Sequence, residues 1–175
     1  LLEGTAITAL VVGGGSAASR KVRGLLAAGA RVLVVAPSVT EELLTLGERE
    51  KNLTIEHRRF QDEDVRDVTL VFAATDERTT NSRITRIARG HHRLVSVADL
   101  PSEGNFSGMA PHCAGDVVIG VPAGGVPRAA ARIRDAVAER FDGRYATPID
   151  ALRAMRRRLL DTGGAAKWEQ AVGTF

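Results

Sequence analysis

A run of three glycines followed by small residues is the first feature of this sequence that could do chemistry. Gly13, Gly15 and Ala18 have the spacing G-x-G-x-x-A, directly after the apolar residues Val11 and Val12. In this spacing the first glycine permits a tight turn, the second lets the backbone approach a pyrophosphate, and the small third residue permits close packing of a helix on a strand. The N–H groups and the dipole at the start of that helix attract phosphate. The pattern therefore predicts a nucleotide-binding turn.

The end of the second apolar run leaves the identity of the nucleotide open. A dinucleotide-binding turn usually has an acidic residue about 20 residues further on, which hydrogen-bonds the ribose. Ala36, Pro37 and Ser38 stand there instead. The motif therefore does not choose between NAD and NADP, and it does not exclude a mononucleotide. A turn that binds nothing is the alternative, but a strand before the motif and a helix after it favour nucleotide binding.

Three polar side chains follow two other apolar runs. Thr75 and Asp76 end one run, and Asp99 ends another. Open parallel sheets bind ligands at the carboxyl ends of their strands, where an aspartate could accept a proton or orient a substrate. The alternative for Asp99 is a turn before Pro101. The alternative for Thr75 and Asp76 is N-capping of the next helix.

These residues must be positioned by alternating strands and helices. Continuous valine-rich runs predict strands buried on both faces, and the amphipathic segments between them predict helices, the first closed by Gly29. The alternation predicts an α/β fold with a Rossmann-type doubly wound parallel sheet. The predicted strands are 8–13, 31–37, 54–58, 69–75 and 93–99, and the predicted helices are 17–28, 39–47 and 77–90.

The alternation stops after residue 99. Residues 100–115 are rich in Pro, Gly and Ser and predict a loop, 116–125 predict one more strand, and 128–141 and 148–161 predict two helices. This second part is too small to bury a core of its own. We expect it to pack on the first domain or on a second copy of itself.

Arginines are concentrated in the last third of the chain, although the net charge is only +3. The bias predicts an acidic partner, with a solvated helix face as the alternative. Aromatic residues make up only 4% of the chain, which disfavours nucleic acid as that partner, because aromatic stacking accompanies such binding. These arginines are Arg128, Arg132, Arg134, Arg140, Arg144, Arg153, Arg156, Arg157 and Arg158.

The single cysteine and the hydropathy indicate where the protein works. Cys113 has no second cysteine to pair with, so an intrachain disulfide is excluded and a reducing, cytoplasmic location is expected. No apolar run is long enough to span a bilayer, and no signal-peptide pattern is present, so we expect no membrane partner. His112 precedes Cys113, but adjacent residues rarely satisfy metal geometry alone, so no metal site is expected.

Four segments that occur in order carry a resemblance to a known family. They read VVGGGSAASRKVRGLLAAGARVLVVAP, LVFAATDERTTN, LVSVADLPSEGNF and GDVVIGVPAGGVPRAAARIRD. Together they resemble the precorrin-2 dehydrogenase family of siroheme biosynthesis, which includes dehydrogenase–ferrochelatases and the N-terminal part of siroheme synthase. The resemblance implies an enzyme that oxidises precorrin-2 to sirohydrochlorin with NAD, and in some members the insertion of ferrous iron.

The resemblance also implies domains, partners and roles for residues. The domains are an NAD-binding Rossmann domain over 1–113, a dimerisation segment over 114–145 and a helical domain over 146–175, in a homodimer that binds the tetrapyrrole. Asp99 is implied as the catalytic residue, linked to metal insertion if the protein is a chelatase. The implied cofactor-binding residues are Gly13, Gly15, Ser16, Ala17, Pro37, Ser38, Thr75 and Asp76, and the implied substrate-binding residues are Asn105, Gly124, Gly125 and Arg128.

The second half departs from the family pattern at PAGGVPR. Pro122 and Ala123 replace two hydroxyl residues, Pro127 replaces a serine, and Met109 replaces a proline. These changes touch the substrate half and leave the dinucleotide half intact. The alternatives are a pocket that tolerates apolar residues, a diverged non-catalytic NAD(H)-binding or sensor protein, and a dehydrogenase that acts on a different ligand.

Overall fold

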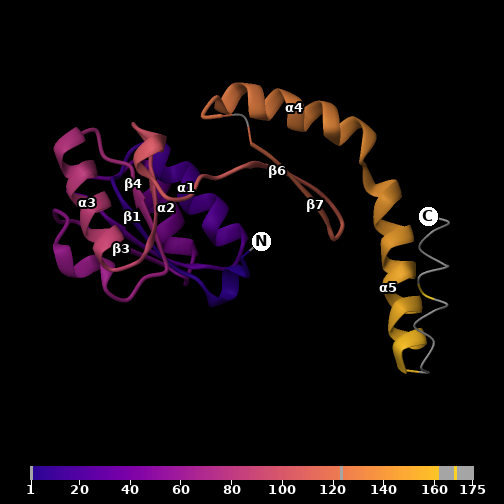
Figure 1. Ribbon diagram of the computed structural model, residues 1–175. Helices are drawn as coiled ribbons and strands as arrows, with labels where there is room; N and C mark the ends of the chain where they lie inside the picture. Colours follow the sequence, from indigo (N-terminus) through magenta and orange to yellow (C-terminus); the bar gives the residue numbers. More distant parts are fainter. Residues whose placement is uncertain (1, 123, 162–167, 169–175) are drawn as a thin grey trace. The chain divides into compact units, whose positions relative to one another are not determined.

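The computed structural model describes residues 2–122, 124–161 and 168. The chain forms two compact units that divide between Ser107 and Gly108 (Figure 1). Ala123 and most of the end of the expected helical domain, residues 162–167 and 169–175, lie outside the described residues.

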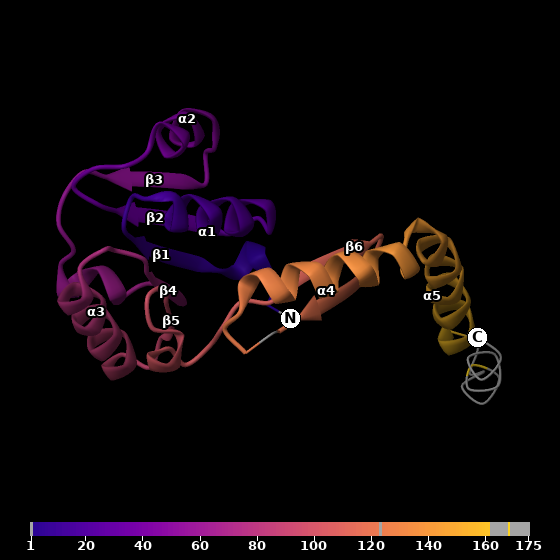
Figure 2. The same ribbon diagram turned by 90° about the horizontal axis from the view of Figure 1, so that it is seen from above.

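The first unit is built on a five-stranded parallel sheet. Its strands have the order β3-β2-β1-β4-β5, so that β1 lies at the centre (Figure 2). This sheet confirms the predicted Rossmann-type α/β fold. The predicted strands run slightly too far at their carboxyl ends, where the chain leaves the sheet to begin the turns that form the site. The strands are β1 (Thr8–Val12), β2 (Arg31–Val35), β3 (Leu53–Glu56), β4 (Leu70–Ala73) and β5 (Leu94–Val97).

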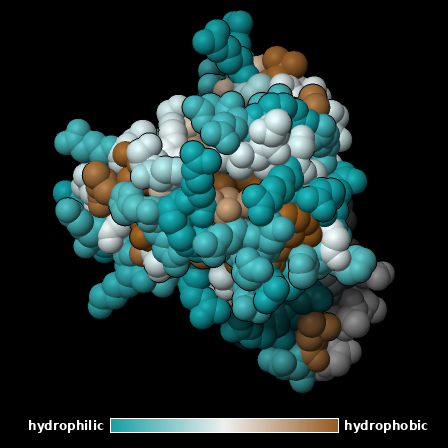
Figure 3. Space-filling view, turned by 90° about the vertical axis from the view of Figure 1, so that its left-hand side faces the viewer, coloured by the Kyte–Doolittle hydropathy of each residue, from teal (hydrophilic) through white to brown (hydrophobic). Residues whose placement is uncertain are grey.

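Helices cover both faces of this sheet. They are α1 (Ser16–Ala27), α2 (Glu41–Arg49) and α3 (Arg78–Gly90). Val11 of β1 packs in one apolar cluster with Val22 of α1, whereas its neighbour Leu10 packs in a second cluster with Ile84 of α3. Successive strand residues point to opposite faces, which explains why the central strands β1 and β4 are apolar over nearly their whole length. The side of the molecule shown in Figure 3 is mainly hydrophilic, with hydrophobic side chains in small separate patches.

The strand order reverses between β1 and β4, because the chain runs outward from β1 through β2 to β3 and then returns to place β4 on the other side of β1. The strands β2 and β3 lie on one side of β1, and β4 and β5 lie on the other. At such a reversal the connections diverge and leave a crevice beyond the carboxyl ends of the strands. The fold therefore predicts a ligand site above β1 and β4.

Gly29 ends α1, as the sequence predicts. Its φ is +80°, in the left-handed region that glycine adopts most easily. The Gly29 N–H donates to Leu26 O at 2.8 Å, and the Ala30 N–H donates to Leu25 O at 3.0 Å. This Schellman pair satisfies the last carbonyls of the helix and turns the chain into β2.

The second unit contains a hairpin and two helices: β6 (Ala110–Ala114), β7 (Val117–Val121), α4 (Pro127–Arg140) and α5 (Ala146–Asp161). The prediction of a loop over 100–115 is wrong at β6, which pairs antiparallel with β7.

The described residues also form short three-ten turns. Those of the first unit are η1 (Gly4–Ala6), η2 (Asp62–Val65) and η3 (Pro101–Glu103), and the second unit contains η4 (Gly143–Tyr145).

The hairpin also bears on the division of the chain into domains. Because β6 pairs with β7, and α4 packs on both strands, residues 108–113 belong to the second unit. Separate dimerisation and helical domains over 114–145 and 146–175 stay predictions. Within the described residues, no helix has the length and apolar character that crossing a bilayer requires.

Candidate functional site

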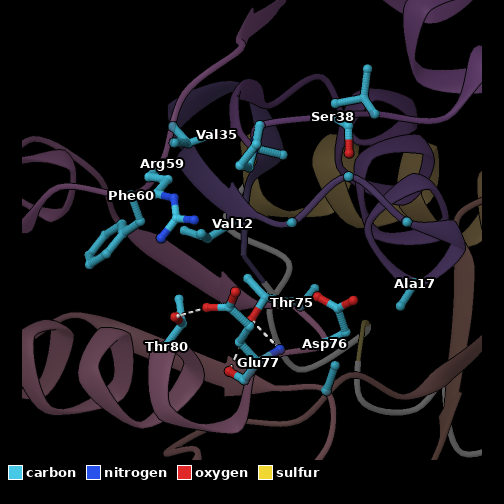
Figure 4. Close-up of a pocket in the computed structure, with 18 of the residues that line it drawn as sticks. Val12, Ala17, Val35, Ser38, Arg59, Phe60, Thr75, Asp76, Glu77 and Thr80 are labelled. Atoms are coloured by element: carbon cyan, nitrogen blue, oxygen red, sulfur yellow. Dashed lines mark hydrogen bonds between the residues drawn. The ribbon is translucent and has the colours of Figure 1, made fainter.

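A pocket of about 850 Å³ lies beyond the carboxyl ends of the strands of the first unit (Figure 4). The turns after β1, β2 and β4, the residues after β5 and the chain after β3 line it. All the cofactor-binding residues expected from the sequence, and the expected catalytic Asp99, line this one pocket. They are Gly13, Gly15, Ser16, Ala17, Pro37, Ser38, Thr75, Asp76 and Asp99.

Gly13 is required by the backbone of the turn itself. Its φ is +124°, and a Cβ at this position would lie 2.2 Å from the Ala74 carbonyl oxygen. The Gly13 N–H donates to Val35 O at 3.0 Å. The first glycine therefore lets the end of β1 pass between β2 and β4 without a side chain.

Gly14 has an equally strict role that sequence reasoning missed. A Cβ on Gly14 would lie 1.9 Å from Ser38 O. The Thr40 N–H donates to Gly14 O at 2.9 Å, and the hydroxyls of Ser19 and Thr40 are 3.0 Å apart. The glycine turn therefore packs tightly against the connection between β2 and α2, and both segments line the pocket.

Gly15 differs from both, because nothing in the protein requires it to be glycine. Its φ of −84° and ψ of −174° are extended backbone that any residue adopts. A Cβ would meet no heavy atom within 4 Å. Gly15 lines the pocket, so the space that a side chain would fill is space at the ligand site. This cradle fits a group that must approach the backbone closely.

The start of α1 offers donors to such a group. The N-cap residue is Gly15, which has no side chain that could cap the helix, and the first turn contains no acidic residue. The N–H groups of Ser16 and Ala17 therefore have no partner within the helix and carry the positive end of its dipole. Together with the cradle at Gly15, these donors fit the pyrophosphate of a dinucleotide.

Asn81 links the two strand ends on the other side of the pocket. Its side chain is fully buried. The Asn81 Oδ1 accepts from the Thr75 N–H at 3.2 Å and from the Thr75 hydroxyl at 2.7 Å. The Asn81 Nδ2 donates to Thr75 O at 2.9 Å and to Asp99 Oδ1 at 2.8 Å. One buried amide therefore fixes both the end of β4 and the carboxylate after β5.

The alternative capping role of Thr75 and Asp76 is wrong. The N-cap residue of α3 is Glu77, and its side chain makes no capping bond. The Thr75 hydroxyl instead accepts from the Glu77 N–H at 3.3 Å and donates to Asn81 Oδ1. Both residues line the pocket.

Asp99 is held on its second oxygen by a cation. Its Oδ2 lies 3.4 Å from a terminal nitrogen of Arg78, which also forms an ion pair with Glu103. The hydrogen bond with Glu103 is the main cause that raises the pKa of Arg78, so its charge persists. The side chain of Asp99 is 35% exposed and stays accessible from the pocket.

The first unit matches a family of known proteins. Residues 2–109 match the family model described as putative NAD(P)-binding. The chain belongs to this family. The siroheme synthase of Nitrosospira multiformis is 43% identical over 119 residues, 66% of this chain and 25% of that protein. The siroheme synthase of Nitrosococcus oceani is 36% identical over 124 residues, 71% of this chain and 26% of that protein.

The resemblance to the siroheme-biosynthesis family is confirmed by these relatives. The chain spans about a quarter of the length of the siroheme synthases that it matches. Among solved structures, one titled "SirC, precorrin-2 dehydrogenase" has the same fold, with a TM-score of 0.72, 23% identity, and coverage of 100% of this chain and 98% of that chain.

Asn105, one of the expected substrate-binding residues, does not line the pocket. The Asn105 Oδ1 accepts from the Val95 N–H at 2.6 Å, and its Nδ2 donates to Arg93 O at 3.0 Å. Both ends of this amide are bonded to the backbone beside β5. We therefore leave Asn105 out of the proposed site.

The other expected substrate residues lie outside the NAD(P)-binding domain, in the second unit. Gly124 and Gly125 have φ values of +52° and +85°, and Arg128 follows at the start of α4. Their contact with a substrate stays a prediction. Within the described residues, no group of three metal-binding side chains occurs, and His112 contacts Phe141 O through its Nε2.

Proposed function

We propose that this chain is an NAD-dependent precorrin-2 dehydrogenase, which oxidises precorrin-2 to sirohydrochlorin in siroheme biosynthesis. The observation that carries the proposal is Asp99, held by a buried amide at the rim of a dinucleotide pocket. The names of the relatives support the substrate, since they are siroheme synthases.

The dinucleotide lies along the pocket in this proposal. The backbone at Gly13 and Gly15 and the N–H groups of Ser16 and Ala17 hold the pyrophosphate. Pro37 and Ser38 contact the adenosine end, and Thr75 and Asp76 contact the nicotinamide end. When bound, NAD supplies the acceptor for the hydride that leaves the substrate.

Asp99 takes the proton that accompanies the loss of hydride. A carboxylate at the ring being oxidised acts as a general base. The amide of Asn81 donates to Oδ1 and sets the orientation of the carboxylate, and Arg78 balances its charge. Asn81 is therefore the positioning residue for Asp99. If the protein is also a chelatase, Asp99 is the residue for metal insertion.

The second unit binds carboxylates of the substrate and carries the dimer interface in this proposal. Arg128 and neighbouring cations pair with the acetate and propionate groups of the tetrapyrrole, with Gly124 and Gly125 beside them. Val118, Val126 and Ile133 are large apolar side chains that are between 47% and 57% exposed. Exposed apolar side chains of this size support association with a second copy. A free Cys113 supports a cytoplasmic location.

An anaerobic assay tests the function. The purified chain is mixed with NAD and with precorrin-2 made in situ, and the absorbances of NADH and sirohydrochlorin are followed together. Formation of both in equal amounts is the expected result. Binding of NAD without oxidation would instead favour a non-catalytic dinucleotide-binding protein or a different substrate.

A further inference from the structure

The two ends of the pocket carry opposite charge. The carboxylates that line it are Asp76, Glu77 and Asp99, and all three follow β4 or β5. The wall formed after β2 contributes Ala36, Pro37 and Ser38, and the wall formed after β3 contributes Arg59 and Phe60. No described residue that lines these two walls is acidic.

Arg59 is held in place by both of its neighbours. The Arg58 guanidinium donates to Glu56 Oε2 at 2.6 Å and to the two carboxylate oxygens of Asp64 at 2.7 and 2.9 Å. Phe60 is 8% exposed and packs in the apolar cluster that contains Val35. The backbone at Arg59 is therefore anchored on both sides, and its side chain extends into the pocket (Figure 4).

The charge of Arg59 is not neutralised within the described part of the chain. The neighbouring carboxylates Glu56 and Asp64 are paired with Arg58. Arg83, the other arginine that lines the pocket, is paired with Asp62 at 2.6 Å. No described residue forms an ion pair with Arg59, which leaves one exposed cation aimed at this end of the site.

This end of the pocket receives the adenosine ribose of a bound dinucleotide. With the pyrophosphate at the start of α1, the ribose 2′-oxygen reaches the end of β2. A carboxylate there would bind the free 2′-hydroxyl and repel a phosphate, whereas an arginine accommodates a 2′-phosphate. This chain has Pro37 and Ser38 at that place, and the Arg59 guanidinium lines the same pocket from the wall after β3.

We propose that the pocket binds NADP as well as NAD, with the Arg59 guanidinium as the ligand of the 2′-phosphate and the Ser38 hydroxyl as a second donor. The pairing is a charge-assisted hydrogen bond to a phosphomonoester, which a planar guanidinium makes with two parallel N–H groups. This inference rests on the dinucleotide site of the proposed function and names a specificity-determining residue in it.

Equilibrium binding tests the inference without any turnover. NADPH and NADH are titrated into the wild-type chain, Arg59→Ala, Arg59→Glu and the control Arg86→Glu, with nucleotide fluorescence as the readout at one ionic strength. Arg86 is exposed on α3 and does not line the pocket, so the control repeats the charge change of Arg59→Glu elsewhere. Thermal melting of each variant verifies that it is folded.

We expect the wild-type chain to bind NADPH at least as tightly as NADH. Arg59→Ala should weaken the binding of NADPH about tenfold, because a charge-assisted contact to phosphate is lost. Arg59→Glu should weaken it further, because the introduced carboxylate repels the phosphate. NADH affinity should stay within about twofold in both variants. Arg86→Glu should leave both affinities unchanged.

Two results would overturn the inference and leave the proposed function standing. One is a wild-type chain that binds NADH but binds NADPH at least about tenfold more weakly. The other is an equal loss of affinity for NADPH and for NADH in Arg59→Ala, which would mean that Arg59 contacts the adenine and not the 2′-phosphate. A chain that binds neither nucleotide would end the proposed function and this inference together.

Discussion

The Asn81 Nδ2 lies 2.8 Å from Asp99 Oδ1, and this contact joins α3 to the turn that follows β5. Asn81 is fully buried, whereas the side chain of Asp99 is 35% exposed. A buried amide with all its bonds made has one orientation, because any rotation leaves a polar group unpaired. The position of the exposed carboxylate is therefore set from inside the protein.

Asn81→Asp should lower turnover by about tenfold to a hundredfold, because a misplaced general base loses much of its effect. The introduced carboxyl keeps the shape of the amide, but when ionised it cannot donate to Asp99. As the pH falls, the introduced group takes up a proton and can donate again, so the relative activity of the variant should rise. Turnover measured from neutral to acidic pH, beside NADH binding, checks this. If the activity of Asn81→Asp relative to the wild type did not change with pH, the positioning role would be contradicted.

Asp99→Asn should lower turnover by about a hundredfold or more, which is the usual contribution of a general base. The substitution keeps the size of the side chain and removes its basicity. NADH affinity should be unchanged, because Asp99 contacts the substrate in our proposal. Anaerobic single-turnover formation of sirohydrochlorin measures the loss. The control is Asp67→Asn, an exposed carboxylate away from the pocket, which should behave as wild type. Full activity in Asp99→Asn would remove Asp99 from the mechanism.

Much of the first unit could be predicted from sequence, because most of its strands lie in valine-rich apolar runs and its helices are amphipathic. The hairpin strand β6 could not be predicted in this way. Its sequence, APHCA, contains a proline and is followed directly by Gly115, and its strand conformation depends on pairing with β7. Pairing between strands is a tertiary effect that local propensity does not contain.

The site was predictable where a motif describes it and was missed where packing decides it. The spacing of Gly13 and Gly15 is part of a motif, whereas Gly14 must be glycine because the backbone of Ser38 and Val39 packs against it. Asn81 did leave a signal in the sequence. It shares a helix face with Ile84 and Ala88, at the spacing i, i+3, i+7, and a polar residue on an apolar stripe requires a buried partner.

Gly14→Ala and Gly15→Ala should have opposite effects, although the two residues are adjacent. A Cβ on Gly14 would lie 1.9 Å from Ser38 O, so the substitution should cost about 3 kcal/mol of stability by overpacking. A Cβ on Gly15 meets nothing within 4 Å, so stability should change by about 1 kcal/mol or less at this N-cap. Gly15→Ala should nevertheless weaken NADH about tenfold or more, because the methyl group occupies the pyrophosphate cradle.

Thermal melts and NADH titrations of both glycine variants provide the check. Each variant is the control for the other, since the chemical change is identical. A Gly15→Ala protein that binds NADH like wild type would show that the pyrophosphate does not approach this backbone. A Gly14→Ala protein with wild-type stability would contradict the tight contact between the turn and the connection from β2 to α2.

Asp64→Asn should destabilise the first unit at neutral pH and lose that effect in acid. Burial raises the pKa of Asp64, but the hydrogen bonds from Arg58 and the Gln61 N–H outweigh it, so its pKa lies below the ordinary value. A carboxyl with a lowered pKa in the folded state stabilises the protein above its unfolded pKa, and the stabilisation disappears as the pH falls through the folded pKa. Urea unfolding of both proteins between neutral pH and about pH 3 should show the two stabilities converging. If the gap stayed constant over this range, the ion pair with Arg58 would not be its cause, and the anchor that holds Arg59 would have to lie elsewhere.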